Sequence, residues 1–333
     1  MNSVFLNRRQ LLRATSSLAM ITVGSLPGES LAQAGYPSRP IRLIIPFAPG
    51  GVTDASGRAI AEHLSKTLGQ QVVPDNRPGA SGNIGSQAAA TAEPDGYTLL
   101  LVLDGTFVIN PYVYEKVPFD SVRDFAPIGK IGDSTIMLVA NPGVKAKSLT
   151  DVIALSKAQP GGLPYGTSGN GSITHIAGEL LKQRTGANLT HVPYKGGGPA
   201  VADVLAGHIP LAFASAASVQ GHLKSGRLVP IGVPSGKRSP QYPDVPTFAE
   251  SGAPNFDLNS WVGIAAPAKT PAAIVQRLNA ALNSALNDPA VRDKLAASGI
   301  SAKPGSTTDF GETIRRELAV YGPVVKAAGI KQD

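Results

Sequence analysis

Runs of apolar residues alternate with stretches of helical periodicity along most of this 333-residue chain. The run Ile41–Phe47 predicts a buried strand, and Ala55–Leu68 carries apolar residues on one helical face. The apolar runs Val72-Val73 and Tyr97–Leu103 predict two further strands. Between them, the alanine-rich segment Ser86–Ala92 is expected to be helical. This β-α-β-α-β order indicates an α/β fold with a doubly wound, mostly parallel sheet flanked by helices.

The same rhythm repeats after residue 135 and then changes to a mainly helical C-terminus. Two α/β repeats in one chain predict two lobes, which we assign to residues 35–133 with 261–333 and to residues 134–260. The two crossovers, near Asp133–Ile136 and Asn259–Val262, would then form a hinge. Strands of the second lobe are expected at Ile136–Ala140, Leu163–Thr167, Leu189–Tyr194, Leu211–Ala214 and Leu228–Val233.

The first 34 residues have the composition of a targeting segment. Arg8 and Arg9 precede a weakly apolar stretch from Ala14 to Leu26, and small residues at the end of the segment suit cleavage after about Ala34. Paired arginines before leucines resemble a twin-arginine signal, although a plain secretory signal would have a similar pattern. The apolar stretch is too short and too polar to span a bilayer. We therefore expect an exported chain with no bilayer-spanning segment after cleavage.

Composition excludes several kinds of site. The chain has no cysteine, which excludes disulfides, thiolate metal sites and a lipid anchor on an N-terminal cysteine. The five histidines form no pair with the spacing of a catalytic zinc site, so no metal is expected. The formal net charge is +7, but the sequence has no basic cluster interleaved with aromatic residues. No nucleic acid is therefore expected as a partner. The glycine pattern at Gly79–Gly85 is too loose for a dinucleotide site, and we expect no cofactor.

A glycine-rich turn, Pro46-Phe47-Ala48-Pro49-Gly50-Gly51-Val52-Thr53-Asp54, follows the first strand directly. We expect a helix to start at Asp54, so that the turn presents backbone N–H groups at a helix N-terminus, where the dipole favours an anion. The glycines are not followed by a Lys-Ser/Thr pair, which excludes a nucleotide P-loop. The turn predicts one half of a carboxylate clamp, and Gly51→Asp is expected to abolish binding.

Two further glycine-bearing turns, Thr167–Ser172 and Lys195–Ala200, also lie between an expected strand and an expected helix. Ligands of open α/β sheets bind beyond the carboxyl ends of the strands, so all three turns should face one cleft. Backbone amides, small hydroxyl groups and three helix dipoles could then hold one carboxylate without a salt bridge, because hydrogen bonds to an anion are short and strong.

Other motifs extend over nearly the whole chain after the targeting segment. They are Tyr36-Pro37-Ser38-Arg39-Pro40-Ile41, Asn76–Gly85, Pro94-Asp95-Gly96-Tyr97, Asn110-Pro111, Tyr165–Ser172 with His175, Pro193-Tyr194-Lys195-Gly196, Pro199, Ser260-Trp261 and Pro267. Together with the first turn they resemble the periplasmic substrate-binding receptors of tripartite tricarboxylate transporters, or Bug-type receptors. The resemblance implies a two-lobed Venus-flytrap fold, a periplasmic location, and a small carboxylate that is passed to an integral-membrane permease. It also implies ordered waters between the binding loops and the carboxylate, and we expect a monomer.

The candidate ligand-binding residues come from the three turns and from neighbouring strand ends. They are Phe47, Pro49, Gly50, Gly51, Thr53, Asp54, Asp104, Thr106, Phe107, Ser168, Asn170, Gly171, Ser172, His175, Tyr194, Pro199, Ala200, Ser215 and Trp261.

Several candidates have a structural interpretation beside the functional one. We expect Asp54 to be the N-cap of its helix. The alternative is that it orders the loop or a water. Ser172 can cap its helix and also contact ligand. His175, within a first helical turn, is expected to be packed and hydrogen-bonded. Tyr194 and Trp261 are commonly packing residues, although their expected position beside the cleft makes ligand contact an equal alternative.

The run Asp104-Gly105-Thr106-Phe107 departs from the family, which often has small hydroxyl residues followed by His here. One hypothesis is that Phe107 makes the distal pocket apolar and Asp104 accepts a hydrogen bond from a hydroxyl, amine or protonated acid of the ligand. An aromatic or mixed-polarity carboxylate would then be favoured over citrate. Independently of this hypothesis, the ligand classes that we consider are an aromatic carboxylate and a dicarboxylate. The alternative is that Asp104-Gly105 only forms a turn.

A periplasmic hydrolase and a sensor-only ligand receptor are the alternative functions. The segment Gly166-Thr167-Ser168-Gly169 suggests a nucleophile, but Asn170 stands where a nucleophile elbow requires glycine. We therefore expect a receptor and no enzyme activity.

Overall fold

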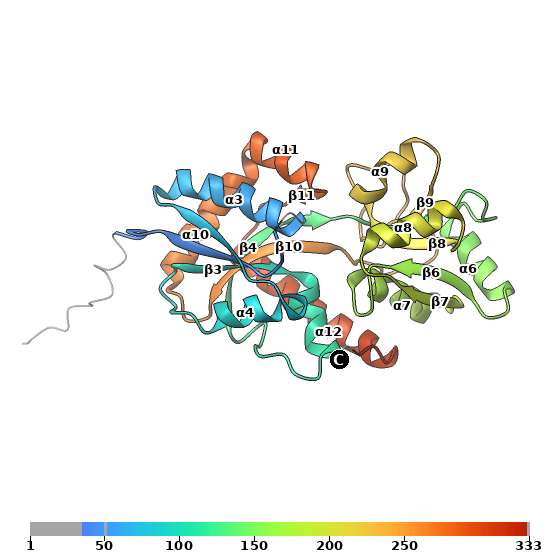
Figure 1. Cartoon of the computed structure of the whole chain (residues 1–333), viewed down its shortest axis with the longest axis horizontal. Coiled ribbons are helices and arrows are strands. Elements are labelled where there is room, and N and C mark those ends of the chain that lie inside the picture. Colours follow the sequence, from blue (N-terminus) through green and yellow to red (C-terminus); the bar gives the residue numbers. More distant parts are fainter. Residues whose placement is uncertain (1–34, 50–51, 332–333) are drawn as a thin grey trace, which may run out of the picture. The chain divides into compact units, whose positions relative to one another are not determined.

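The computed structural model describes residues 35–49 and 52–331, without the side chain of Val52. Contacts divide the chain into residues 1–36 and 37–333, and all elements described below lie in the second unit (Figure 1). The predicted targeting segment and the glycine pair Gly50-Gly51 lie outside the described residues. None of the described helices combines the length and the apolarity needed to cross a membrane.

The first sheet has six strands in the order β11-β4-β10-β3-β1-β2. Strand β1 pairs in parallel with β2 and β3, whereas β10 runs antiparallel to β3 and β4, and β11 runs antiparallel to β4. The strands are β1 (Ile41–Ile45), β2 (Val72–Asn76), β3 (Thr98–Leu103), β4 (Phe125–Ser134), β10 (Ser260–Pro267) and β11 (Ile300–Ala302).

Helices pack on both faces of the first sheet (Figure 1). Helices α3, α10 and α11 contact one another on one face, and α4 and α12 lie on the other. Their bounds are α3 (Val52–Leu68), α4 (Asn83–Ala90), α10 (Ala272–Asn287), α11 (Pro289–Ala297) and α12 (Thr307–Ala327). Short helical turns follow two strands: η1 (Ala80–Gly82) after β2, and η2 (Gly105–Ile109) with α5 (Asn110–Val113) after β3.

The second sheet has five strands in the order β7-β6-β8-β5-β9. Strand β6 pairs in parallel with β7 and β8, and β5 runs antiparallel to β8 and β9. The elements are β5 (Ile136–Ala140), α6 (Leu149–Ala158), β6 (Leu163–Thr167), α7 (Ile173–Thr185), β7 (Leu189–Pro193), α8 (Gly197–Ala206), β8 (Leu211–Ser215), α9 (Ala216–Lys224) and β9 (Val229–Gly232).

The chain passes between the two sheets along a pair of adjacent antiparallel strands. Strand β4 ends at Ser134, and β5 of the second sheet begins two residues later at Ile136. The return path enters β10 at Ser260, which lies opposite Ser134 in the β4–β10 register. Both crossovers therefore leave the same end of one strand pair, which is the geometry of a two-stranded hinge.

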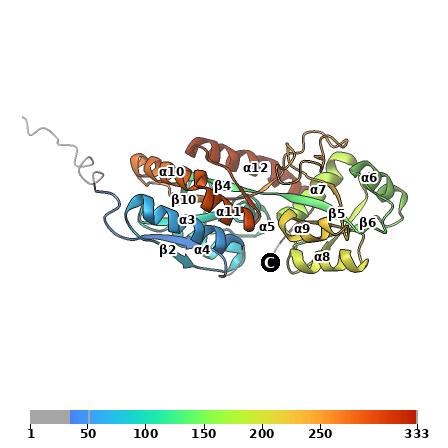
Figure 2. The same ribbon diagram turned by 90° about the horizontal axis from the view of Figure 1, so that it is seen from above.

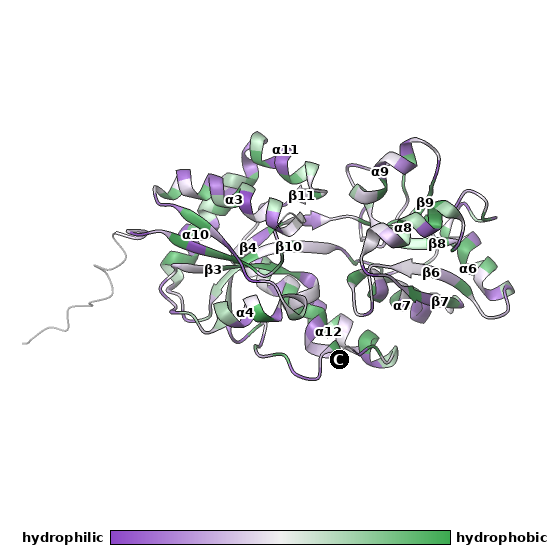
Figure 3. Cartoon of the chain, in the orientation of Figure 1, coloured by the Kyte–Doolittle hydropathy of each residue, from purple (hydrophilic) through white to green (hydrophobic). Residues whose placement is uncertain are grey.

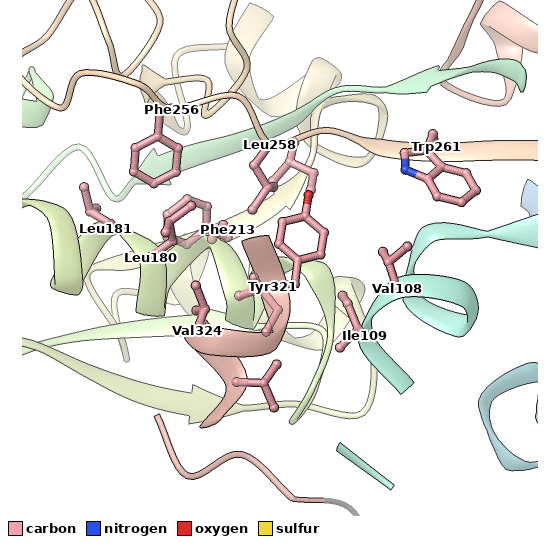
Figure 4. Close-up of a cluster of buried hydrophobic side chains, with 14 of the residues drawn as sticks. Val108, Ile109, Leu180, Leu181, Phe213, Phe256, Leu258, Trp261, Tyr321 and Val324 are labelled. Atoms are coloured by element: carbon pink, nitrogen blue, oxygen red, sulfur yellow. The ribbon is translucent and has the colours of Figure 1, made fainter. Parts of the chain in front are cut away.

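One apolar cluster extends from the first sheet to the second. Alternate residues of β3 face α4 and α12, and alternate residues of β8 face α7, because side chains point to opposite faces along a strand. The C-terminal part of α12 packs against α7 (Figure 2). Figure 4 shows Tyr321 and Val324 of α12 near Leu180 of α7 and Ile109 of η2. Figure 3 shows hydrophobic residues along the central strands and hydrophilic residues on the outer helix surfaces.

The predicted two-lobed α/β fold is confirmed, with differences at element ends and in strand direction. Helix α3 starts at Val52, two residues before the predicted Asp54, and α8 starts at Gly197, inside the predicted turn Lys195–Ala200. The sheets are mixed because each crossover strand inserts with the opposite direction beside the parallel β-α-β units. Strand β4 was not expected, since Gly, Lys and Asp interrupt its apolar pattern.

Candidate ligand-binding site

A cavity of about 410 Å³ lies where the carboxyl ends of β1 and β3 face the carboxyl end of β6. Its lining comes mainly from turns and helix starts that follow strands of the two sheets, and it includes the start of β10 in the first sheet. The lining residues are Phe47, Thr53, Ser81, Leu103, Asp104, Gly105, Thr106, Asn110, Ser168, Gly169, Asn170, Gly171, Ser172, Ile173 and Ser260. Most of the side chains are small and polar, and Asp104 is the only charged residue in this set.

Asp54 fixes the turn that carries Phe47 and Thr53. Its buried carboxylate accepts hydrogen bonds from Arg58 Nε at 3.0 Å and from Asn76 Nδ2 at 3.0 Å. The same amide nitrogen of Asn76 donates to the carbonyl of Phe47 at 3.0 Å. The predicted N-cap role is wrong, because the helix already begins at Val52 and Asp54 lies inside its first turn. The arrangement agrees with the alternative interpretation, in which Asp54 orders the loop.

Ser81 reaches the cavity from a turn with an unusual backbone. Ala80 and Ser81 have φ angles of 47° and 51°, a left-handed conformation that residues other than glycine rarely adopt. The carbonyl of Ser81 accepts hydrogen bonds from Thr106 Oγ1 at 2.8 Å and from Asn110 Nδ2 at 3.1 Å. Its hydroxyl bonds to Tyr114 Oη at 2.9 Å. Strained backbone that neighbouring groups hold in place is typical of binding sites.

Asp104 closes the cavity at the end of β3. Its side chain is 2% exposed, and Oδ1 accepts a hydrogen bond from Ser260 Oγ at 3.2 Å. The other oxygen, Oδ2, is buried and has no hydrogen-bond partner among the described residues. Burial raises the pKa of Asp104 to about 7, although hydrogen bonds from Gly105 N–H and Ser260 act in the opposite direction.

The loop Ser168–Ser172 forms the opposite wall and leads into α7. Ser172 caps this helix, since its hydroxyl accepts a hydrogen bond from the backbone N–H of His175 at 3.2 Å. The hydroxyls of Ser168 and Ser172 both bond to Thr174 Oγ1, at 2.9 Å and 2.8 Å. A helix N-terminus with small hydroxyl groups in front of it favours an anion.

His175 and His191 support this loop from behind. His175 is buried, and its Nδ1 accepts a hydrogen bond from the backbone N–H of Gly171 at 3.2 Å. Its ring stacks on that of His191 with 3.6 Å between centroids, and His191 Nε2 bonds to Thr167 Oγ1 at 2.7 Å. Burial lowers the pKa of His191 to about 4, so this ring is neutral near pH 7.

Eight of the predicted candidates line the cavity. They are Phe47, Thr53, Asp104, Thr106, Ser168, Asn170, Gly171 and Ser172. The candidate list omits Ser81, Leu103, Gly105, Asn110, Gly169, Ile173 and Ser260. Three of these had a signal in the sequence: Ser81 lies in the glycine-rich run Gly79–Gly85, Asn110 precedes Pro111, and Ser260 precedes Trp261.

Three aromatic candidates pack elsewhere. Phe107 is fully buried and contacts Phe119 and Phe125, so it does not make the cavity apolar as hypothesised. Trp261 is also fully buried, because its position in β10 points it under α12 and not toward the cavity. Tyr194 bonds to Asp203 Oδ2 at 2.6 Å and lies outside the cavity lining.

The other candidates that the structure describes also lie outside the lining of this cavity, whereas Gly50 and Gly51 are not among the described residues. Ala200 is buried in the apolar cluster between α8 and the second sheet, and Pro199 and Pro49 are exposed. Ser215 precedes α9, and His175 lies behind the loop that lines the cavity. The expectation that three turns share one cleft is therefore met for two of them, since the turn Lys195–Ala200 is absent from the lining.

Comparisons with known proteins are consistent across sequence and structure. Residues 57–330 match the sequence model described as the tripartite tricarboxylate transporter family receptor. The protein BugT of Bordetella pertussis is 39% identical over 300 residues, which cover 89% of this chain and 91% of BugT. The structure described as R. palustris Rpa4515 with adipate has a TM-score of 0.75 at 35% identity, covering 89% of this chain and 99% of that one. MatC from Rhodopseudomonas palustris with bound malate has a TM-score of 0.71 at 29% identity, covering 87% and 100%.

Proposed function

Since the chain belongs to the tripartite tricarboxylate transporter receptor family, we propose that it captures a small organic carboxylate in this cavity and delivers it to a membrane permease. In this proposal, residues 35–133 with 261–333 form one lobe and residues 134–260 form the other. The receptor acts in the periplasm as a monomer after removal of the targeting segment.

One observation supports the proposal most directly: small neutral polar groups that follow strands of both sheets line one cavity, and no basic side chain is among its described lining residues. Thr53 lies at the start of α3, and Ser168 and Ser172 precede or cap α7. Hydroxyls and backbone amides at a helix start bind an anion through charge-assisted hydrogen bonds, which are about twice as strong as neutral ones. Two structurally similar proteins are described with adipate and with malate, both dicarboxylates.

Ligand capture then follows from the position of the two walls. Thr53 in α3 and Thr106 in η2 follow strands of the first sheet, and Ser168 and Ser172 follow β6 of the second sheet. A carboxylate that bonds to both walls has a higher affinity for the closed arrangement than for an open one, and it shifts the population toward closure by that difference. The paired strands β4 and β10 provide the hinge.

The experiment that tests the proposal places a negative charge at the anion-binding wall without removing a helix cap. Asp and Asn cap helices about equally well, so Ser172→Asp and Ser172→Asn differ mainly in charge. Two like charges about 4 Å apart repel by about 4 kcal/mol at an effective dielectric constant near 20. We expect Ser172→Asp to weaken binding of adipate or malate at least about a hundredfold in calorimetric titrations, and Ser172→Asn to weaken it much less.

Thermal unfolding of both variants provides the control. Both melting temperatures should lie close to that of the unchanged protein, because each replacement retains a capping side chain at position 172. Equal affinities of Ser172→Asp and Ser172→Asn for carboxylates would show that the anion is bound elsewhere.

A further inference from the structure

The carboxylate of Asp104 is an unexplained feature of the cavity. It lies at the end of β3, lines the cavity and is 2% exposed. Ser260 Oγ donates to Oδ1, but Oδ2 is buried without a partner among the described residues. A buried polar atom without a hydrogen bond is costly, and a ligand that supplies the missing donor would recover that cost.

We propose that Asp104, together with Ser260, is the binding point for the ammonium group of an aminocarboxylate ligand. This inference rests on the proposed function, because the carboxylate of the same ligand would occupy the wall formed by Ser168–Ser172. It extends that function by assigning the chemical class of the ligand.

The charges around Asp104 favour a cation over a second anion. Among the lining residues that the structure describes, Asp104 alone is charged. Behind it, α12 contributes the buried acid Glu317, whose carboxyl accepts a hydrogen bond from Trp261 Nε1 at 2.6 Å. The hydroxyl of Tyr321 on the same helix can both donate and accept, so it favours neither charge. The basic group that acts on Asp104 from β4 is Lys130, and it is already paired with Asp133. Two carboxyl groups therefore lie at this end of the cavity, which favours a cationic ligand group.

The opposite end of the cavity has the reverse polarity. The N-terminus of α7 carries the positive end of the helix dipole, with the hydroxyls of Ser168 and Ser172 at its start. A ligand with a carboxylate at one end and an ammonium at the other complements both ends. An ammonium group also offers three N–H donors, enough to satisfy Oδ2 and the remaining acceptor capacity nearby.

Matched ligand pairs test the assignment. Adipate and 6-aminohexanoate differ by exchange of one carboxylate for a protonated aminomethyl group, and malate and aspartate differ by exchange of a hydroxyl for an ammonium. We expect the unchanged protein to bind at least one amino compound about tenfold or more tightly than its partner in calorimetric titrations. Asp104→Asn should weaken that binding about a hundredfold, and it should leave dicarboxylate binding equal or tighter, because the new amide donates to a carboxylate.

Asp293→Asn is the matched control, since it removes the same charge from an exposed position of α11. It should leave every affinity unchanged. If dicarboxylates bind more tightly than both amino compounds and Asp104→Asn weakens all ligands alike, the ammonium site is refuted while the carboxylate receptor stands. If none of the four compounds binds, both proposals fail.

The release or uptake of protons on ligand binding is a second measurement. It would not depend on Asp104 if this residue had only a structural role. An ammonium group favours the ionised carboxylate, so binding near pH 7 should release protons from Asp104 into the buffer. A dicarboxylate held by a protonated Asp104 would take protons up. Titrations in buffers of different ionisation enthalpy measure the sign, and Asp104→Asn should abolish the release. Proton uptake with the amino compounds would contradict the assignment.

Discussion

Replacement of Trp261 by alanine is expected to lower the free energy of unfolding by about 5 kcal/mol. The indole is fully buried, and its ring meets that of Phe310 edge-on with 5.2 Å between centroids. Loss of a buried tryptophan ring costs about 3–5 kcal/mol through lost burial and the remaining cavity. In addition, the buried carboxyl of Glu317 loses its donor, which costs about 1–3 kcal/mol.

Urea unfolding at pH 7, followed by circular dichroism, measures this loss. Trp261→Phe reduces the loss of packing, because it retains a buried six-membered ring while it removes the N–H donor together with the five-membered ring of the indole. We expect Trp261→Phe to cost roughly one to three kcal/mol. An alanine variant that loses less than about 2 kcal/mol would show that the residue is not packed as described.

Replacement of Asp104 by asparagine is expected to stabilise the ligand-free protein, increasingly so with pH. Burial raises the pKa of Asp104 to about 7 in the folded protein, from an ordinary value of 3.8. The folded state favours the protonated form of Asp104. Its ionisation therefore lowers the free energy of unfolding progressively as the pH rises from about 4 to about 7, and the full loss persists above pH 7. The shift corresponds to about 4 kcal/mol. The variant should therefore resemble the unchanged protein near pH 4 and exceed its stability by up to about 4 kcal/mol near pH 8.

Unfolding free energies at several pH values between 4 and 8 measure this difference. Glu317, whose pKa is raised to about 8 by burial and also by the nearby charge of Asp104, makes the stability fall with pH as well. Because Asp104→Asn removes that charge, the fall due to Glu317 is smaller in the variant and adds to the expected difference in the same direction. The exposed change Asp293→Asn should produce no such pH-dependent difference. A constant difference between Asp104→Asn and the unchanged protein would mean that Asp104 ionises normally in the fold. Residues that bind ligands at a cost in stability are common in functional sites.

The positions of the binding loops could be predicted because they depend on local sequence. A buried strand followed by glycine and small hydroxyl residues gave the first turn and the loop Ser168–Ser172, both of which reach the cavity. The cap at Ser172 was predicted by its position before an apolar helical pattern. The acidic residue at the end of β3 also stood out, since it departs from the family pattern.

The direction of individual side chains could not be predicted in the same way. Phe107 follows Thr106 in the turn η2, and only the packing of Phe119 and Phe125 decides that its ring enters the core. Ser81 reaches the cavity through a left-handed backbone held by Thr106 and Asn110, two contacts more than 20 residues away in sequence. Strand β4 is recognised only by its pairing with β10 and β11.

The position of Trp261 has a consequence for the study of ligand capture. It is the single tryptophan of the chain, it follows Ser260 directly, and its indole N–H bonds to the buried acid Glu317. A ligand that alters the charge on Asp104 changes the electric field at the indole ring of Trp261. Intrinsic fluorescence is thus a built-in optical reporter of occupancy, and its emission requires no added label.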